Sequence, residues 1–420
     1  MKVLFISPNQ GLYSSTTNGY GGAGWIASLQ QHVEKVSDIE LAMTFKHETD
    51  STKREIGNTT YYPICIPPKK GLKKLSYYWH GYKKEVYDTY IIDKIKEVIV
   101  DFKPDIVHIF GTESEMCGII GETGIPSVIH IQGILNPIIN TYFPPGINEK
   151  IFMSPRYFRE FWLRNGIVFN YRRMKLSAVR ELKFLKKSKY FFGRTDWDKR
   201  ITQLYNDKSE YYHIDEILRT DFYSSSKWSY KAGSLNLLST ISPNAYKGLD
   251  LILNTAKLLK MTNKNFNWKV IGIKKSYYTE IIEKELGISH NDVNVTYIGI
   301  KNSKEIIENI LDSTIYIHPS YIDNSPNSLC EAQYIGIPCL STNVGGITTI
   351  MDNRNEYMVP ANDPHLLASR ILSLETDLKE NRYTNPYMEI AIDRHNPQRI
   401  IDTLKNAYSN IINSEKRETI

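Results

Sequence analysis

The sequence has little cysteine: 4 of its 420 residues, far apart and without a Cys-x-x-Cys pair. This excludes a disulfide-stapled secreted domain and a cysteine-based zinc site. No run approaches the roughly 18 consecutive apolar residues of a membrane span. The apolar stretch after Met1 is too short for a secretory signal. We therefore expect a cytoplasmic protein.

Charge is unevenly distributed along the chain. Residues 1–220 carry 31 Lys and Arg against 24 Asp and Glu, whereas residues 221–420 carry 21 against 22. The whole basic excess therefore lies in the first half. This asymmetry favours two domains with different partners, one of them anionic.

Short apolar runs alternate with amphipathic segments, and many of the runs are continuous rather than alternating. That pattern is typical of parallel strands covered on both faces, and it predicts an α/β fold. The expected strands are 3–7, 39–45, 61–66, 105–110, 127–131, 190–192, 235–241, 268–273, 293–298, 314–318, 339–341 and 357–359. The expected helices are 25–36, 85–100, 249–259, 304–310, 366–374 and a terminal one after Asn396-Pro397.

The strand–helix pattern starts twice, near Lys2 and near Leu235. We expect a first doubly wound domain over 1–220, a linker over 221–234 and a second domain over 235–394. A terminal helix over 395–420 would pack back on the first domain. The aromatic and basic stretch from about 138 to 189 reads as a helical insertion of the first domain, and such insertions are often functional.

Three segments carry chemistry. Gly21 and Gly22 lie in a glycine-rich turn before the first helix, where backbone amides can approach an anion or simply turn the chain. Lys247, followed by Gly248, comes after the strand near Leu235 and can neutralise a phosphate or lie on the surface.

The third segment is the most specific, because Asp323 and Glu331 are eight residues apart at a strand–loop–helix junction. Asp323 would lie in the loop and Glu331 about one turn into the helix, so the pair could meet two ends of one ligand. The alternatives are a helix cap for Asp323 and a solvated helix residue for Glu331. Helix amides would face a diphosphate between them. The accompanying candidates are Ser325, Asn327, Ser328, Leu329, Gly345 and Gly346.

This stretch resembles the signature of retaining GT-B glycosyltransferases of the glycosyltransferase family 4 type. The family pattern is an acid, seven residues and Glu, then Gly-x-Pro and Val-Gly-Gly; here Asp323 replaces the first Glu. The resemblance implies two Rossmann-like domains with a cleft between them and a C-terminal helix crossing back to the first.

The chain departs from that pattern at two further positions. The family often has Arg five residues before the lysine, where this chain has Ser242, so Arg219 or Arg194 would have to supply that diphosphate contact. The family often has His-Gly where this chain has Gln132-Gly133. Gln132 is thus the candidate for touching the donor sugar, and His130 is expected to be packed.

The resemblance implies transfer of a hexosyl unit from a nucleotide-sugar to a glycan or polyprenyl-linked acceptor, with retention at the anomeric carbon. Lys247 and helix amides would stabilise the leaving diphosphate, Glu331 would hold the ribose and Asp323 a sugar hydroxyl. By analogy the pathway makes a bacterial surface polysaccharide: capsule, exopolysaccharide or O-antigen. No cofactor, metal or nucleic-acid partner is expected.

Other interpretations remain open. A phosphorylase or nucleotide-sugar epimerase could use the same architecture, and a sugar-binding protein without catalysis is a third class. Asp196-x-Asp198 is a rival signal for a divalent metal, although flanking basic residues favour helix-surface ion pairs.

Basic and aromatic residues cluster twice in the first half. Residues 69–84 hold six lysines among aromatic side chains and no acid, and residues 172–200 hold 11 Lys and Arg against 3 acids. This composition predicts peripheral contact with an anionic membrane, the alternative being a solvated loop.

Overall fold

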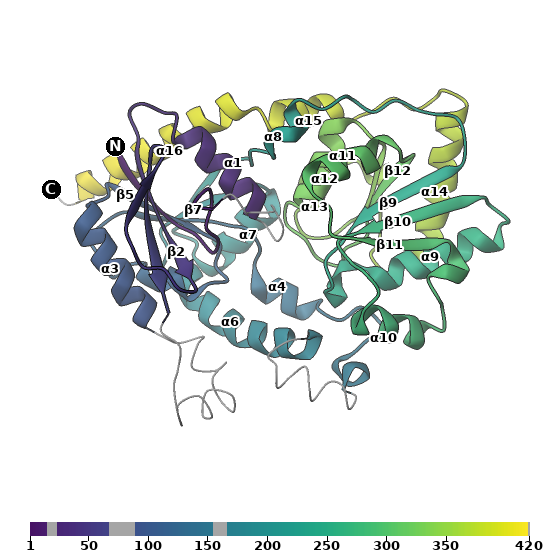
Figure 1. Ribbon diagram of the computed structural model, residues 1–420, viewed down its shortest axis with the longest axis horizontal. Coiled ribbons are helices and arrows are strands. Elements are labelled where there is room, and N and C mark those ends of the chain that lie inside the picture. The colour runs from purple at the N-terminus through teal and green to yellow at the C-terminus, as the bar shows by residue number, and fades with distance from the viewer. Residues whose placement is uncertain (15–22, 67–88, 154–165, 419–420) are drawn as a thin grey trace. The chain divides into compact units, whose positions relative to one another are not determined.

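The computed structural model describes residues 1–14, 23–66, 89–153 and 166–418, and its chain divides into two compact units (Figure 1). The first unit comprises Met1–Asn136, Arg172–Ile217 and His395–Ile420, and the second Pro137–Tyr171 and Leu218–Arg394. The expected boundaries near 220 and 395 lie close to these limits. Residues 137–171, expected in the first domain, instead group with the second.

The first unit is built on a sheet whose described strands run in the order β3-β4-β2-β1-β5-β6-β7-β8. Every pair is parallel except the antiparallel edge pair of β3 and β4. The strands are β1 (Lys2–Ile6), β2 (Glu40–His47), β3 (Arg54–Ile56), β4 (Thr59–Cys65), β5 (Ile106–Phe110), β6 (Ser127–His130), β7 (Tyr190–Gly193) and β8 (Glu210–His213). Strands such as β5 and β7 are buried along their whole length, which explains their continuous apolar sequences.

The second unit is built on an entirely parallel sheet, in the order β11-β10-β9-β12-β13-β14 among the described strands. The strands are β9 (Leu235–Thr240), β10 (Phe266–Ile271), β11 (Val295–Gly299), β12 (Ile315–His318), β13 (Cys339–Thr342) and β14 (Met358–Val359). The chain moves outward from β9 in both directions, so the strand order reverses between β9 and β12. Ligands of open parallel sheets bind at such a reversal, beyond the carboxyl ends of the strands.

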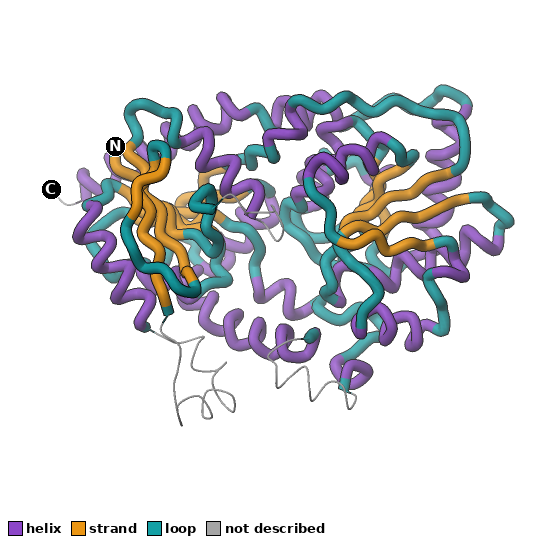
Figure 2. The backbone as a smooth tube through the Cα atoms, in the orientation of Figure 1, coloured by secondary structure: helices purple, strands orange, loops and turns teal. Residues whose placement is uncertain are grey.

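Helices connect the strands of both units, as Figure 2 shows in purple around the orange sheets. In the first unit they are α1 (Ala23–Val33), α3 (Tyr90–Phe102), α7 (Asp196–Tyr205) and α16 (Pro397–Glu418). The second has α4 (Leu135–Asn140, starting at the unit boundary), α8 (Thr220–Tyr223), α9 (Leu249–Met261), α10 (Tyr277–Leu286), α11 (Ser303–Leu311), α12 (Asn327–Ile335), α13 (Ile347–Ile350), α14 (Pro364–Lys379) and α15 (Met388–Arg394). Helix α6 (Ile167–Lys187) contains the unit boundary, and short 3-10 turns are η1 (Glu115–Ile119), η2 (Glu149–Phe152), η3 (Ala245–Lys247), η4 (Asn291–Val293) and η5 (Asn355–Tyr357).

The terminal helix α16 packs within the first unit. Tyr408 is fully buried, and its hydroxyl lies 2.6 Å from Nδ1 of His108 on β5. Burial lowers the pKa of His108 to about 3, so the imidazole is neutral at physiological pH. Its Nδ1 can therefore accept a hydrogen bond from the Tyr408 hydroxyl. Among the described helices none combines the length and apolarity needed to cross a membrane.

Candidate functional site

Two loops meet beyond β9 and β12 and hold each other closely. Gly248 has φ +79°, and a Cβ at this position would lie 2.0 Å from the carbonyl oxygen of Pro319, so only glycine fits here. The backbone N–H of Tyr321 donates to the carbonyl of Tyr246 at 2.8 Å, and the Tyr321 hydroxyl donates to Asp250 at 2.6 Å. These contacts fix the loop that carries Asp323 against the turn that carries Lys247.

Lys247 and Asp323 form an ion pair at this junction. Lys247 Nζ lies 2.6 Å from Asp323 Oδ2, with the two side chains 19% and 17% exposed. Burial by itself raises the pKa of Asp323, but the charge of Lys247 and the hydrogen bond from His318 outweigh it, and the pKa lies well below its usual range. Asp323 is therefore ionised at neutral pH.

Arg219 and Glu331 form a second pair in the same unit. Arg219 Nε donates to Glu331 Oε1 and Nη2 donates to Oε2, each at 2.7 Å, which is the two-pronged geometry of a strong contact. Glu331 lies in α12 with its side chain only 4% exposed, whereas the Arg219 side chain is 18% exposed. Arg219, considered from sequence as a diphosphate contact, thus binds Glu331.

The start of α12 lies between Asp323 and Glu331 in the sequence and presents backbone N–H groups. Asn327 and Ser328 are the first two helical residues, whose N–H groups have no acceptor within the helix. Leu329 differs from expectation, because its N–H donates to the Pro326 carbonyl at 3.0 Å and its side chain is buried in the core. Ser325 is also buried.

Gly345 and Gly346 support the Asp323 loop through the backbone. Gly345 has φ +52°, and a Cβ there would lie 2.0 Å from the Asp323 carbonyl oxygen. The N–H of Gly346 donates to that same oxygen at 3.0 Å. The glycine pair, predicted to contact the donor, therefore packs against the backbone of the Asp323 loop.

The remaining described candidates lie in the first unit. Gln132 follows β6 and is half-buried. His130, the last residue of β6, is fully buried with Nδ1 3.1 Å from His108 Nε2. The sequence placed Gly21 and Gly22 at the donor, but both lie outside the described residues.

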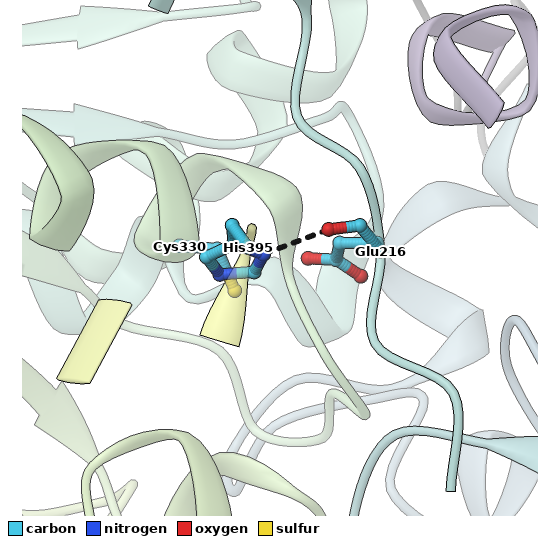
Figure 3. Close-up of side chains that lie close together, drawn as sticks. All are labelled: Glu216, Cys330 and His395. Atoms are coloured by element: carbon cyan, nitrogen blue, oxygen red, sulfur yellow. Dashed lines mark hydrogen bonds between the residues drawn. The ribbon is translucent and has the colours of Figure 1, made fainter. Parts of the chain in front are cut away.

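Arg194 is enclosed in the first unit, contrary to the expectation that it could supply a diphosphate contact. Its side chain is 4% exposed and forms an ion pair with Glu216, which is equally buried. The guanidinium also lies over Trp25, 5.0 Å from the ring centroid. His395 Nδ1 bonds the Glu216 carbonyl at 2.8 Å (Figure 3), which further fixes this segment. The guanidinium of Arg194 is therefore bound by groups of the first unit.

The Asp-x-Asp tripeptide also has a structural explanation. Asp198 is buried at the third position of α7 and completes a capping box with Thr195. Its carboxylate accepts the N–H of Arg194 at 3.0 Å and the hydroxyl of Tyr211. Since backbone and tyrosine donors occupy Asp198, the motif acts as a helix cap. This differs from both the metal site and the surface ion pairs considered from sequence.

Sequence reasoning missed His318. It ends β12, is 2% exposed, and its Nε2 lies 3.1 Å from Asp323 Oδ2. Its position at the end of a buried strand, five residues before the acid, was the available signal.

The second unit resembles known glycosyltransferases. Residues 237–389 match the family described as Glycosyl transferases group 1. The matched segment contains Lys247, Asp323 and Glu331.

Two curated relatives match part of the chain. WcaL of Escherichia coli (strain K12), named for colanic acid biosynthesis as a glycosyltransferase, is 28% identical over 159 residues, covering 35% of this chain and 38% of its own. The amylovoran biosynthesis glycosyltransferase AmsK of Erwinia amylovora is 26% identical over 149 residues, covering 33% and 36%. The aligned part is thus less than two fifths of either relative.

The fold has solved counterparts over its whole length. Sucrose-phosphate synthase from Thermosynechococcus elongatus superposes with a TM-score of 0.71 at 12% identity, covering 98% of this chain and 99% of that one. At this identity the likeness concerns the fold alone. The expected fold class, GT-B with two parallel α/β sheets, is confirmed.

Proposed function

We propose that the protein is a retaining hexosyltransferase of the glycosyltransferase family 4 type. It moves a sugar from a nucleotide-sugar to a glycan or polyprenyl-linked acceptor in the biosynthesis of a bacterial surface polysaccharide, on the cytoplasmic side of the membrane. The observation that carries this proposal is the ion pair of Lys247 and Asp323 beyond the carboxyl ends of β9 and β12, in the domain that matches glycosyltransferases. The names of WcaL and AmsK supply the polysaccharide context.

The donor's diphosphate is the ligand proposed for Lys247. The ammonium is at the carboxyl edge of the sheet, and its long side chain can turn from Asp323 toward a phosphate. The N–H groups of Asn327 and Ser328 add partial positive charge at the start of α12. These groups stabilise the charge that develops on the diphosphate as it leaves.

The remaining candidate residues are assigned to the ribose and to the transferred sugar of the donor. Glu331 accepts hydrogen bonds from the ribose hydroxyls, and Arg219 holds its carboxylate in place. Asp323 accepts from a hydroxyl of the transferred sugar, and Gln132 remains the sequence-based candidate for touching that sugar. Gly21 and Gly22 remain donor-binding candidates from sequence.

In the proposed reaction the bond between the anomeric carbon and the diphosphate oxygen breaks. The acceptor oxygen forms its bond to the anomeric carbon on the same face, and the acceptor's proton passes to the departing diphosphate. No cofactor enters this step. Its products are the glycosylated acceptor and a nucleoside diphosphate, which balances atoms and charge.

The first experiment is a thermal-shift panel with UDP, GDP and ADP, followed by turnover of the matching nucleotide-sugars. A ligand that binds only the folded state raises the melting temperature, so one base should stand out. NMR of the product should then show the donor's anomeric configuration. Inversion would refute the retaining mechanism, and absence of any shift or turnover would refute the function.

The same assay separates the alternatives. A phosphorylase requires orthophosphate or releases a sugar phosphate, and an epimerase converts the donor without an acceptor. A sugar-binding protein leaves the donor intact after long incubation. Each outcome differs from acceptor-dependent release of a nucleoside diphosphate.

Helix α6 supports the proposed contact with an anionic membrane. Lys175, Lys183 and Lys186 are exposed, and their spacing places them on one face together with Val179, which is 56% exposed. The one acid within 172–187, Glu181, is buried. The exposed face is therefore basic with an apolar centre. The other basic segment, 69–84, lies outside the described residues.

Sedimentation with anionic and neutral liposomes tests this contact. Each basic residue near an anionic surface contributes about 1 kcal/mol, so changing these three lysines to glutamine should weaken binding by more than tenfold. A control with the same charge change uses the exposed Lys257, Lys274 and Lys275 of the second unit. Equal binding of both triple variants, or equal binding to neutral liposomes, would refute a specific contact.

A further inference from the structure

The two carboxylate oxygens of Asp323 have different surroundings. Oδ2 lies within hydrogen-bond distance of three donors: Lys247 Nζ at 2.6 Å, His318 Nε2 at 3.1 Å and Ser320 Oγ at 3.3 Å. Oδ1 accepts the N–H of Asn324 at 3.2 Å. Oδ2 thus has more protein donors than Oδ1, which leaves Oδ1 with more capacity to accept from a ligand's hydroxyl.

The tautomer of His318 follows from this contact. An ionised carboxylate only accepts hydrogen bonds, so the Nε2 facing it must carry a proton. In the neutral ring Nδ1 is then a lone pair, and this buried atom has no partner among the described residues. Among the described residues the contact with Asp323 is therefore the one hydrogen bond that orients the ring.

The donors to Oδ2 differ in how firmly they are held. Lys247 is 19% exposed on a long flexible side chain, whereas His318 is 2% exposed at the end of a central strand. The His318 carbonyl also accepts the hydroxyl of Ser341 at 3.2 Å. A ligand can therefore draw the lysine away while the histidine stays in place.

We infer that His318 is a positioning residue, which holds Asp323 in place through Nε2–H when Lys247 turns to the donor's diphosphate. This rests on the proposed function of Lys247. Before donor binds, Lys247 and Ser320 also contact Oδ2, so losing His318 alone has little effect on the position of Asp323. After the lysine has turned, His318 is the shorter of the two contacts that remain on Oδ2, and its loss leaves only the 3.3 Å contact from Ser320 during the reaction.

Three substitutions separate the two ring nitrogens. His318→Gln places an amide N–H close to the Nε2 position, His318→Asn places one close to Nδ1, and His318→Leu fills similar space without a donor. A hydrogen bond to a charged group is worth roughly 10- to 100-fold in rate when it is needed only during the reaction. We expect kcat to fall by about that factor in the Leu and Asn variants and to recover to within about threefold in the Gln variant, with donor KM changing less than threefold throughout.

The coupling to Asp323 is measured in the Asp323→Asn background. There His318→Leu should cause no further loss of kcat, because the group it positions has already been altered. The exposed His365 of α14 supplies the control, since His365→Leu should leave both constants unchanged.

The outcomes distinguish this inference from the proposed function. If wild-type protein turns over none of the nucleotide-sugars, the function fails and the role of His318 with it. If wild-type protein is active but the Gln and Leu variants are equally impaired, or the losses in the Asp323→Asn background simply multiply, then His318 only packs. Full activity of the Leu variant would overturn the inference as well.

Discussion

Removing Arg219 should destabilise the second unit more than its position near the surface suggests. Its partner Glu331 is 4% exposed, and both carboxylate oxygens accept from the guanidinium. Breaking a buried pair from one side costs about 3–5 kcal/mol, because the remaining charge stays buried without its countercharge. The guanidinium also lies over Phe222, 5.0 Å from its centroid, which adds a smaller cation–π contribution.

The variant to make is Arg219→Met, which keeps the apolar stem and removes the charge. We take about 3 kcal/mol, the lower end of the range, because Arg219 is partly exposed and water can reach the vacated space. For a unit of this size 1 kcal/mol moves the melting temperature by about 2–4 °C, so the transition should fall by about 6–12 °C. Differential scanning calorimetry at pH 7.5 resolves a change of that size.

Glu331→Gln and the double variant test the reasoning. Glu331→Gln leaves the charge of Arg219, the more exposed partner, without a countercharge. This variant should therefore lose less stability than Arg219→Met. Arg219→Met with Glu331→Met removes both charges and should be at least about 2 kcal/mol more stable than Arg219→Met alone. A shift below 2 °C for Arg219→Met, or a double variant no better than the single one, would refute the buried-charge argument.

Three further predictions follow from the described contacts. Lys247→Ala should lower kcat by about 30- to 1,000-fold as well as weaken donor binding, whereas Glu331→Gln should mainly raise donor KM; saturation curves for the donor separate the two. Burial raises the pKa of Glu113 to about 7, above its unfolded value near 4.5, so the stability it contributes is full below pH 4.5 and lost as pH rises through 7. Glu113→Gln should therefore stabilise the protein by about 3 kcal/mol at pH 8 relative to pH 4, measured by urea unfolding, and equal effects at both pH values would contradict this. Turnover should persist in excess EDTA, and loss of activity restored by Mn²⁺ would return Asp196 and Asp198 to consideration.

The sheets were predictable because parallel strands leave a strong signal. The expected strand 314–318 is β12, and 235–241 is β9, since each contains a short run of buried residues in which apolar side chains are frequent. The edge strand β3, Arg-Glu-Ile, is exposed at all three positions and was missed. An exposed edge strand has no hydrophobic pattern to find, because its pairing is set by its neighbour β4.

The aromatic insertion shows where sequence reasoning stops. Residues 138–189 were expected to form a helical insertion of the first domain; α6 is helical as expected, but residues 137–171 group with the second unit. Tyr142 instead lies 5.5 Å from Tyr246, centroid to centroid, and the Tyr277 hydroxyl donates to the Phe152 carbonyl. Aromatic composition indicates burial against something, and only the tertiary structure identifies the partner.

The residues of the candidate site were also only partly predictable from the sequence. Spacing was enough to select Asp323 and Glu331, because eight residues across a loop–helix junction is a local property. Their cationic partners come from 76 and 112 residues away, so no local pattern indicates that Lys247 meets one acid and Arg219 the other. Charge alone favours a diphosphate contact for Arg219, whereas the structure shows its guanidinium bound to both oxygens of Glu331.

The two pairs also suggest why the site uses different cations. Arg219 contacts both oxygens of a nearly buried carboxylate, a geometry that a lysine cannot reproduce, and this suits a partner that stays in place. Lys247 contacts one oxygen of a more exposed carboxylate that His318 also holds. A single ammonium on a flexible stem is easier to transfer to an arriving phosphate, because Asp323 keeps a donor when it leaves. Exchanging the residue types tests this: Lys247→Arg should tighten the hold on Asp323 and lower kcat, whereas Arg219→Lys should destabilise the unit without that selective loss.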